Sequence, residues 1–233
     1  MIHIINRHCN FSQVSVNKTR PSWFSREKCF INLIKTFQNK GIKLHVIFDG
    51  DISSHFVDKY GSSIDSIRVV KAGKETIAFK EAIKYATEIS SNDNDILYFV
   101  EDDYVHRSNS SLILEEGFDI FKNNACISLY DHADKYNQEM YNNLSSQIFA
   151  GKLSHWRTTP STTNTFAITK YNLNKYFDQF TLFSPDKLPC SLDHNRHLQL
   201  WKLGLPTVTS IPGYSTHCAP DYLSPVIDWE KEL

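Results

Sequence analysis

The sequence predicts a single α/β domain, residues 1–233, built on a mostly parallel central sheet with helices on both faces. Strand and helix patterns alternate through the first half, the order that produces parallel strands joined by crossover helices. One predicted strand, Ile96–Val100, is a continuous apolar run, typical of a strand covered on both faces. Three consecutive carboxylates, at 101–103, end it abruptly. A length of 233 residues suits one such domain.

Composition excludes several classes of protein. The 25 basic and 26 acidic residues nearly cancel, so we expect no nucleic-acid partner held by a general basic field. No apolar run approaches the ~20 residues of a membrane span, so we expect no transmembrane segment. The five cysteines are scattered without CxxC spacing, which favours a reducing, cytoplasmic setting. The sequence carries no signal of oligomeric state.

The first elements follow from local patterns. Residues 2–6 form the first predicted strand, and residues 10–24 form a polar loop. Ser25 is a good helix N-cap, and Gly41 is a good stop for the helix that follows. The apolar positions that give this helix its period are Phe30, Leu33, Ile34 and Phe37.

Four more strands and two helices complete the first half. The predicted strands are 43–48, 66–70, 95–100 and 125–130. A helix begins after Gly73, because apolar residues then recur with helical spacing. These residues are Ile77, Ala78, Ala82, Tyr85, Ala86 and Ile89. A second helix is expected near 110–122.

The second half is less regular. Residues 131–160 are polar and predict an irregular stretch. Ser191 is the expected N-cap of a last helix that ends at Gly204. The residues expected to face the core from this helix are Leu198, Trp201 and Leu203. The remaining predicted elements are a strand at 163–168, a helix near 172–180 and a strand at 207–211.

The carboxylates Glu101, Asp102 and Asp103 form the strongest candidate site. They crowd the carboxyl end of a buried strand, where they repel one another unless a cation lies between them. Open α/β sheets bind ligands at this edge. A hard divalent ion carrying a nucleotide diphosphate explains the cluster, and a solvated acidic turn is the alternative.

Four features occur in an informative order along the chain. They are the acidic strand end at 101–103, a Thr/Ser-rich turn at 158–163, the acidic helix start Asp193, and the late histidine His217. This order resembles the GT-A fold glycosyltransferases, which transfer sugar from a nucleotide donor, over about residues 2–220. The chain is also loosely similar to viral and bacterial rhamnosyl- or glucosyltransferase domains.

The resemblance implies a Rossmann-like GT-A domain with two functional halves. Residues 1–130 would bind the nucleotide sugar, and residues 131–233 would hold the acceptor and the catalytic base. The partners would be a nucleotide-sugar donor, with a UDP-sugar favoured, and a glycan or glycolipid acceptor. The cofactor would be a divalent metal, Mn²⁺ or Mg²⁺.

The resemblance also assigns roles at the acidic strand end. Asp103 would be the direct metal ligand of a DxD-type motif. Glu101 or Asp102 would bind the donor ribose or reach the metal through water. The first position is Glu rather than Asp, which leaves that division open. His217 would complete the metal shell as a neutral imidazole, although a lone histidine is more often structural.

Two further residues would meet the donor. Asp49 ends the second strand and matches the aspartate that accepts the ring N–H of uracil in many relatives; it could equally be a turn aspartate before Gly50. Lys74 lies in a glycine-led turn resembling that of family-2-type members, near a helix N-terminus where phosphate binds. Those members carry Arg-Asn where this chain has Ala78 and Phe79, and Lys74 could also be a surface lysine.

Asp193 is the candidate catalytic base of an inverting transferase. A carboxylate in the first turn of a helix is stabilised, which lowers its pKa, and a bound diphosphate pushes the pKa the other way. The alternative is plain complementation of the helix dipole. Arg157 would hold the diphosphate, and Trp156 and Thr162 would contact the acceptor, unless Trp156 serves packing.

Other functions remain open at this point. A retaining transferase of the same fold would not need Asp193. A nucleotidyltransferase would share the sheet, metal and nucleotide, but it normally has a glycine-rich loop after the first strand, and Asn6–Phe24 contains no glycine. A metal phosphoesterase usually needs histidine-rich strand ends. A non-catalytic sugar-nucleotide-binding module would keep Asp103 without using Asp193.

Overall fold

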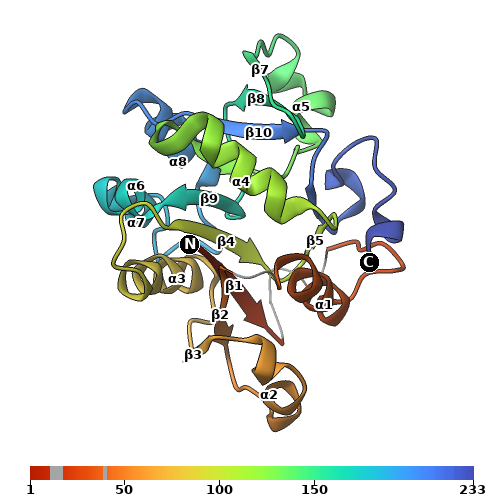
Figure 1. The fold of residues 1–233 in the computed structure, drawn as a ribbon, viewed down its shortest axis with the longest axis vertical. Helices are drawn as coiled ribbons and strands as arrows, with labels where there is room; N and C mark the ends of the chain where they lie inside the picture. Colours follow the sequence, from red (N-terminus) through yellow and green to blue (C-terminus); the bar gives the residue numbers. More distant parts are fainter. Residues whose placement is uncertain (11–17, 39–40) are drawn as a thin grey trace.

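The structure is a computed structural model that describes residues 1–10, 18–38 and 41–233, so part of the predicted loop at 10–24 lies outside the described residues (Figure 1). Its centre is one nine-stranded sheet with the order β3-β2-β1-β4-β9-β6-β10-β8-β7. A separate two-stranded sheet pairs β11 with β5. The described helices include none with the length and apolar character needed to cross a bilayer.

The predicted parallel core is present. Strands β1 (Ile2–Cys9), β2 (Ile42–Asp49), β3 (Ser66–Val70) and β4 (Ile96–Glu101) form it. They pair in parallel, with β1 between β2 and β4. The register aligns Cys9 with Asp49 and Arg7 with Glu101, so the polar residues that end these strands meet at one edge of the sheet.

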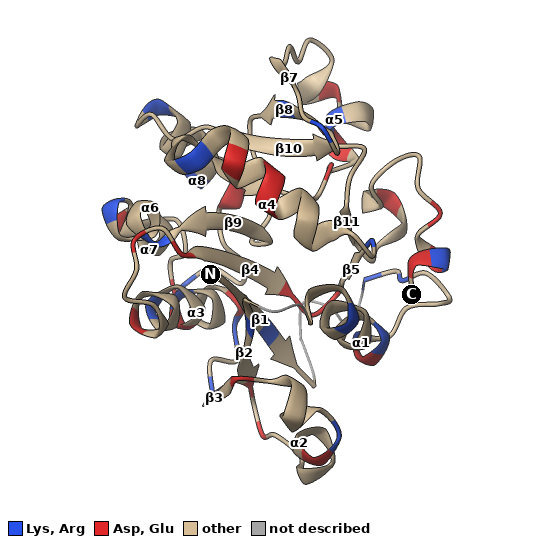
Figure 2. Ribbon diagram, viewed as in Figure 1, with Lys and Arg blue, Asp and Glu red and all other residues tan. Residues whose placement is uncertain are grey.

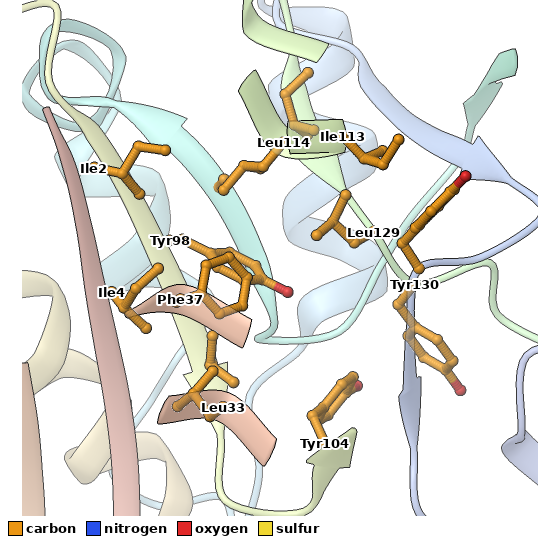
Figure 3. Packing of buried hydrophobic residues seen from close by; sticks show 14 of the residues in the cluster. Ile2, Ile4, Leu33, Phe37, Tyr98, Tyr104, Ile113, Leu114, Leu129 and Tyr130 are labelled. Carbon is orange, nitrogen blue, oxygen red and sulfur yellow. The ribbon is translucent and has the colours of Figure 1, made fainter. Parts of the chain in front are cut away.

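Helices cover both faces of this core, as the alternating pattern predicts. Ser25 caps α1 (Arg26–Phe37) and accepts the Lys28 N–H at 3.0 Å, as expected. On that face α1 packs with α4 (Ser110–Phe121) (Figure 3). On the opposite face α3 (Glu75–Ile89) packs with the helices of the second half.

The second half extends the sheet in mixed directions. Strand β9 (Phe166–Thr169) runs antiparallel to both β4 and β6 (Cys126–Ser128). Strand β10 (Thr207–Ile211) returns parallel to β6. The stretch 131–160, expected to be irregular, contains three short elements and one longer strand. They are α5 (Asp134–Asn137), η3 (Glu139–Tyr141), β7 (Ile148–Ala150) and β8 (His155–Thr159).

The remaining helices are short. They are α2 (Ser54–Tyr60), α6 (Lys170–Lys175), α7 (Phe177–Leu182) and α8 (Asp193–Lys202), with single 3₁₀ turns at Gly61–Ser63, Lys122–Asn124, Pro220–Tyr222 and Trp229–Glu232.

Two expectations for α8 are wrong. Its N-cap is Leu192, because the Ser191 hydroxyl is turned away to donate to Glu75 at 2.9 Å. Its buried residues are Arg196, His197 and Leu200. Trp201 and Leu203, expected inward, are 40% and 43% exposed. The spacing of the apolar residues therefore predicted a buried face of α8 that is shifted by about one residue from the observed one.

The small sheet joins two distant parts of the chain. Strand β5 (Tyr104–His106) follows the acidic strand end directly, and β11 (Ser215–His217) pairs with it antiparallel. The register aligns His217 with Tyr104, and the Cys218 N–H donates to the Asp103 carbonyl at 2.9 Å. This pairing carries the late histidine to the end of β4.

Acidification is expected to destabilise the fold through His106, the last residue of β5, whose Nε2 lies 2.8 Å from the Tyr98 hydroxyl. Burial lowers the pKa of His106 from the ordinary 6.5 to about 3. Below pH 6.5 the unfolded chain therefore binds a proton that the folded protein does not, and the free energy of unfolding falls until the pH nears 3. Each pKa unit corresponds to about 1.4 kcal/mol.

Urea unfolding of the wild type and His106→Gln between pH 7 and pH 4 measures this contribution. Glutamine keeps a polar contact for Tyr98 but does not titrate, so the variant should lose less stability on acidification than the wild type. Parallel pH profiles of the two proteins would contradict the assignment.

Candidate functional site

The three carboxylates at the end of β4 face different partners. Glu101, the last residue of the strand, forms an ion pair with Arg7 on β1, with Oε1 2.8 Å from Nη2. Figure 2 shows a basic segment of β1 near the acidic end of β4. Burial raises the pKa of Glu101 to about 7 against the opposing charge of Arg7, and Asp103 and Glu75 add to the rise. Burial therefore opposes ionisation of Glu101, and the ion pair with Arg7 favours it.

Asp102 is engaged in structural contacts. Its Oδ2 accepts the Cys9 N–H at 3.0 Å and the Arg26 Nε–H at 3.0 Å. The carboxylate thus joins the end of β1 to the first residue of α1. Burial raises the pKa of the Cys9 thiol to about 12, and Asp102 adds to this shift, so Cys9 stays protonated at neutral pH.

Asp103 and His217, the two predicted metal ligands, lie in contact with each other. His217 Nε2 lies 3.0 Å from Asp103 Oδ2, although 114 residues separate them. The His217 ring stacks on Tyr104, with centroids 5.5 Å apart. Arg20 Nη2 also donates to Asp103 Oδ2, at 2.8 Å. Burial alone would raise the pKa of Asp103, but His217 and Arg20 hold it well below its usual range.

Asp103 and His217 offer an oxygen and a nitrogen donor to a divalent ion, and the Arg20 guanidinium already supplies a cation at that carboxylate. Within the described ranges no group of three or more histidine, cysteine and acidic side chains is arranged to hold a metal. Ions of the Mg²⁺ type often use one or two protein carboxylates and take other ligands from substrate phosphates and water. The oxygen and nitrogen ligands of Asp103 and His217 therefore fit a metal ion that binds together with a diphosphate.

A buried polar network extends from Glu101 toward α8. Arg7 Nη1 donates to Glu75 Oε1 at 2.8 Å, and Asn164 Nδ2 donates to the same oxygen at 2.6 Å. The other oxygen of Glu75 accepts the Ser191 N–H at 2.7 Å. Burial opposes ionisation of Glu75, but Arg7 and Ser191 lower its pKa below the ordinary value. Glu75 is therefore an ionised link between β1 and the segment that precedes α8.

Asp193 begins α8 two residues after this link. Its Oδ1 accepts the His194 N–H at 2.7 Å. The expectation that the helix start lowers the pKa of Asp193 is wrong: burial raises it, and Glu75 adds to the rise while Arg196 opposes it. Arg196 itself is fully buried, where it donates to Asn164 Oδ1 at 2.6 Å. Desolvation of Asp193 outweighs the charge of Arg196 and the hydrogen bond from the His194 N–H, which both lower its pKa.

The two predicted donor residues near the start of α3 already have partners. Asp49 Oδ1 accepts the Ala72 N–H at 2.8 Å, and Oδ2 accepts the Gly73 N–H at 3.1 Å. Gly73 has a positive φ of 65°, a conformation that favours glycine. Lys74 is the N-cap residue of α3, and its Nζ donates to the Asp186 carbonyl at 3.0 Å. Asp49 thus shapes the turn that presents the start of α3.

The predicted acceptor residues are buried, and this is a correction. Trp156 is fully buried, and its Nε1 donates to Glu116 at 3.3 Å. Thr162 is 4% exposed and its hydroxyl lies 2.9 Å from that of Ser128. Both side chains therefore pack inside the domain and do not reach an acceptor.

Arg157 also forms an ion pair within the protein. Its Nη2 donates to Asp131 Oδ1 at 2.7 Å, and the guanidinium lies over the Tyr136 ring at 5.2 Å. Both members of the ion pair are buried. Contact with a donor diphosphate would require Arg157 to leave Asp131.

The indole that is open to solvent on this side belongs to Trp201. It lines a cavity of about 320 Å³ near the end of α8. The residues around the cavity are Leu144, Ser145, Thr158, Pro160, Leu198, Trp201 and Lys202. His194, Leu198 and Trp201 are spaced i, i+4 and i+7, so one stripe of α8 runs from beside Asp193 to this cavity.

Sequence reasoning missed the charged partners of the site. Arg7, Arg20, Arg26 and Glu75 were not singled out, because each contacts its partner from a distant part of the chain. One signal was present: Arg7 is the one lysine or arginine in the first strand, which pairs with the strand that ends in the carboxylates. A buried arginine needs a carboxylate, and the cluster at 101–103 supplies it.

Comparison with known proteins supports the fold. No protein-family model and no curated protein match the chain. S. aureus TarS 1–349 aligns with a TM-score of 0.57 at 13% identity, over 92% of this chain and 59% of that one. The galactosyltransferase LgtC, solved with donor and acceptor sugar analogues, aligns at 0.51 and 11% identity over 88% and 72%. A Bacillus anthracis protein assigned as a glucose-1-phosphate thymidylyltransferase aligns at 0.53 and 12% identity over 93% and 89%.

These similarities confirm the expected resemblance at the level of the fold. The chain spans 59% of the TarS fragment, and identities this low establish architecture alone. The parallel core, the mixed second half and the flanking helices form a GT-A-like α/β fold, which glycosyltransferases and nucleotidyltransferases share.

Proposed function

We propose that the chain is a metal-dependent glycosyltransferase that moves a sugar from a nucleoside diphosphate to a hydroxyl of a glycan or glycolipid. The observation that carries the proposal is the Asp103–His217 pair, which the β5–β11 pairing places at the carboxyl edge of the parallel core. An oxygen and a nitrogen donor at that edge suit an ion that also binds phosphate. A bound divalent ion would neutralise charge on the departing diphosphate.

Asp193 is the proposed general base of a single displacement. It takes the proton from the acceptor hydroxyl while that oxygen bonds to the anomeric carbon. The bond from this carbon to the diphosphate oxygen breaks, and its electron pair leaves with the nucleoside diphosphate. Attack from the face opposite the leaving group inverts configuration. The raised pKa of Asp193 makes its ionised form a stronger base.

A uridine donor is favoured by the position of Asp49. Its carboxylate ends β2 at the same edge and accepts two backbone N–H groups from the turn before α3. A carboxylate has about four lone-pair directions, so it can also accept the ring N–H of uracil.

We retain the cytoplasmic setting as a prediction; the five cysteines are all free thiols, which agrees with it.

A nucleotidyltransferase is the second candidate, favoured by the match to the Bacillus anthracis structure at a TM-score of 0.53. Such an enzyme forms a nucleotide sugar and pyrophosphate from a nucleoside triphosphate and a sugar phosphate. Incubation with each nucleotide class separates the two candidates, because only a nucleotidyltransferase releases pyrophosphate. Slow hydrolysis of a UDP-sugar would also exclude a non-catalytic binding module.

Thermal stability in the presence of nucleotides tests the donor site. We expect UDP with Mn²⁺ to raise the unfolding temperature, and GDP or ADP to do so much less. A ligand at 100 times its Kd stabilises the native state by about 2.7 kcal/mol. Asp103→Asn should reduce the shift, because it removes the charged metal ligand. No shift with any nucleotide, with or without metal, would refute the donor site.

Replacement of Asp193 separates binding from catalysis. Asp193→Asn should reduce kcat by about 100-fold or more, because a general base is lost, and should leave the Mn²⁺–UDP thermal shift intact. Asp178→Asn is the matched control, since Asp178 also lies in the first turn of a helix, α7, but on the surface. Near-normal turnover in Asp193→Asn would contradict an inverting mechanism through this residue.

We further propose that the acceptor follows the α8 stripe to Trp201. Eight residues of helix separate Asp193 from Trp201, or about 12 Å, the length of a short oligosaccharide. Trp201→Ala should raise the KM for the acceptor without changing the Mn²⁺–UDP thermal shift. Leu203→Ala removes a similarly exposed apolar side chain that does not line the cavity and should leave that KM unchanged. Equal effects of the two variants would refute this path.

A further inference from the structure

Arg20 occupies the carboxylate on which the proposed metal site depends. Its Nη2 donates to Asp103 Oδ2 at 2.8 Å, and the same oxygen faces His217 Nε2 at 3.0 Å. A divalent ion bound between Asp103 and His217 would use this oxygen. Two cations cannot share it at close range without strong repulsion. The guanidinium and the metal are therefore competitors for one ligand atom.

The position of Arg20 is well supported by its surroundings. Its Nη1 donates to the Cys218 carbonyl at 2.7 Å, and the Cys218 N–H donates to the Asp103 carbonyl at 2.9 Å. The guanidinium also lies 4.5 Å from the centroid of the Phe24 ring. The side chain is only 14% exposed. A charge-assisted hydrogen bond to Asp103, a hydrogen bond to a backbone carbonyl and the face of an aromatic ring thus hold the Arg20 guanidinium at this site.

The charge balance around Asp103 explains why such a cation is needed. Asp103 is 6% exposed, and Glu101 is two residues away. A buried carboxylate without a counter-charge is strongly unfavourable. Arg7 pairs with Glu101 and with Glu75, and Arg26 pairs with Asp102. Arg20 is the arginine that pairs with Asp103, beside the hydrogen bond to His217. A metal ion at Asp103 would replace the role of Arg20 and release its guanidinium.

We propose that Arg20 is an internal counter-cation that competes with the divalent metal for Asp103 and turns to the donor diphosphate when the metal binds. This inference rests on the metal site of the proposed function. A diphosphate accepts paired hydrogen bonds from a guanidinium, so nucleotide binding draws Arg20 from Asp103 and metal binding frees it for the nucleotide. Metal and nucleotide therefore strengthen each other's binding, by an equal factor in each direction.

Direct Mn²⁺ binding, measured by the electron paramagnetic resonance signal of free Mn²⁺, tests the proposal without enzyme turnover. We expect weak binding of Mn²⁺ alone to the wild type and at least about tenfold tighter binding when UDP is present. Arg20→Gln should bind Mn²⁺ alone about tenfold more tightly than the wild type, and UDP should then add less. Unchanged or weaker Mn²⁺ binding by Arg20→Gln would overturn the proposal.

Two matched variants separate competition from general electrostatics. Arg26→Gln removes the same charge beside Asp102, and its effect on Mn²⁺ binding should be much smaller than that of Arg20→Gln. Arg20→Lys keeps the charge without the forked geometry and should fall between the wild type and Arg20→Gln. Equal gains in Arg26→Gln and Arg20→Gln would overturn direct competition. Circular dichroism of each variant confirms that it is folded.

Asp103→Asn distinguishes failure of this inference from failure of the proposed function. Loss of Mn²⁺ binding in Asp103→Asn, with no gain in Arg20→Gln, would keep the metal site and overturn the role of Arg20 alone. Equal Mn²⁺ binding by the wild type and Asp103→Asn, or none by any variant with or without UDP, would overturn both.

Discussion

The candidate site depends on one buried guanidinium, that of Arg7. It lies between Glu75 at the start of α3 and Glu101 at the end of β4, at 2.8 Å from each. Loss of one partner from a buried ion pair typically costs about 3–5 kcal/mol, because the remaining charge is left uncompensated. Glu75 extends the restraint to Ser191 before α8. The edge of the parallel core and the start of the second half are thereby held as one polar unit.

The parts of the fold that local pattern decides could be predicted from the sequence. The apolar strand at 96–100, the Ser25 cap and the periodic helix after Gly73 all lie where expected, because each depends on neighbours within a few residues. The pairing of Asp103 with His217 was expected from family order alone. No local property of either segment indicates that β5 and β11 form a separate small sheet.

The predictions that were wrong concern residues whose contacts lie far away in the sequence. Trp156 lies in a polar run, yet it is buried because Gly117 on α4 leaves space for the indole: a Cβ there would lie 2.7 Å from its ring. Arg20 and Asp103 are separated by 83 residues, and Arg7 and Glu75 by 68. Burial of Asp193 likewise depends on tertiary packing, so its helix position alone gave the wrong direction for its pKa.

The small β5–β11 sheet also sets the order in which the site can form during synthesis. Asp103 leaves the ribosome more than a hundred residues before His217, and only the pairing of Ser215–His217 with Tyr104–His106 unites them. A nascent chain that has completed the parallel core therefore still lacks one of the two proposed metal ligands. Under the proposed function, an ion would bind to both residues only after β11 has paired with β5, when nearly all of residues 131–233 have been made.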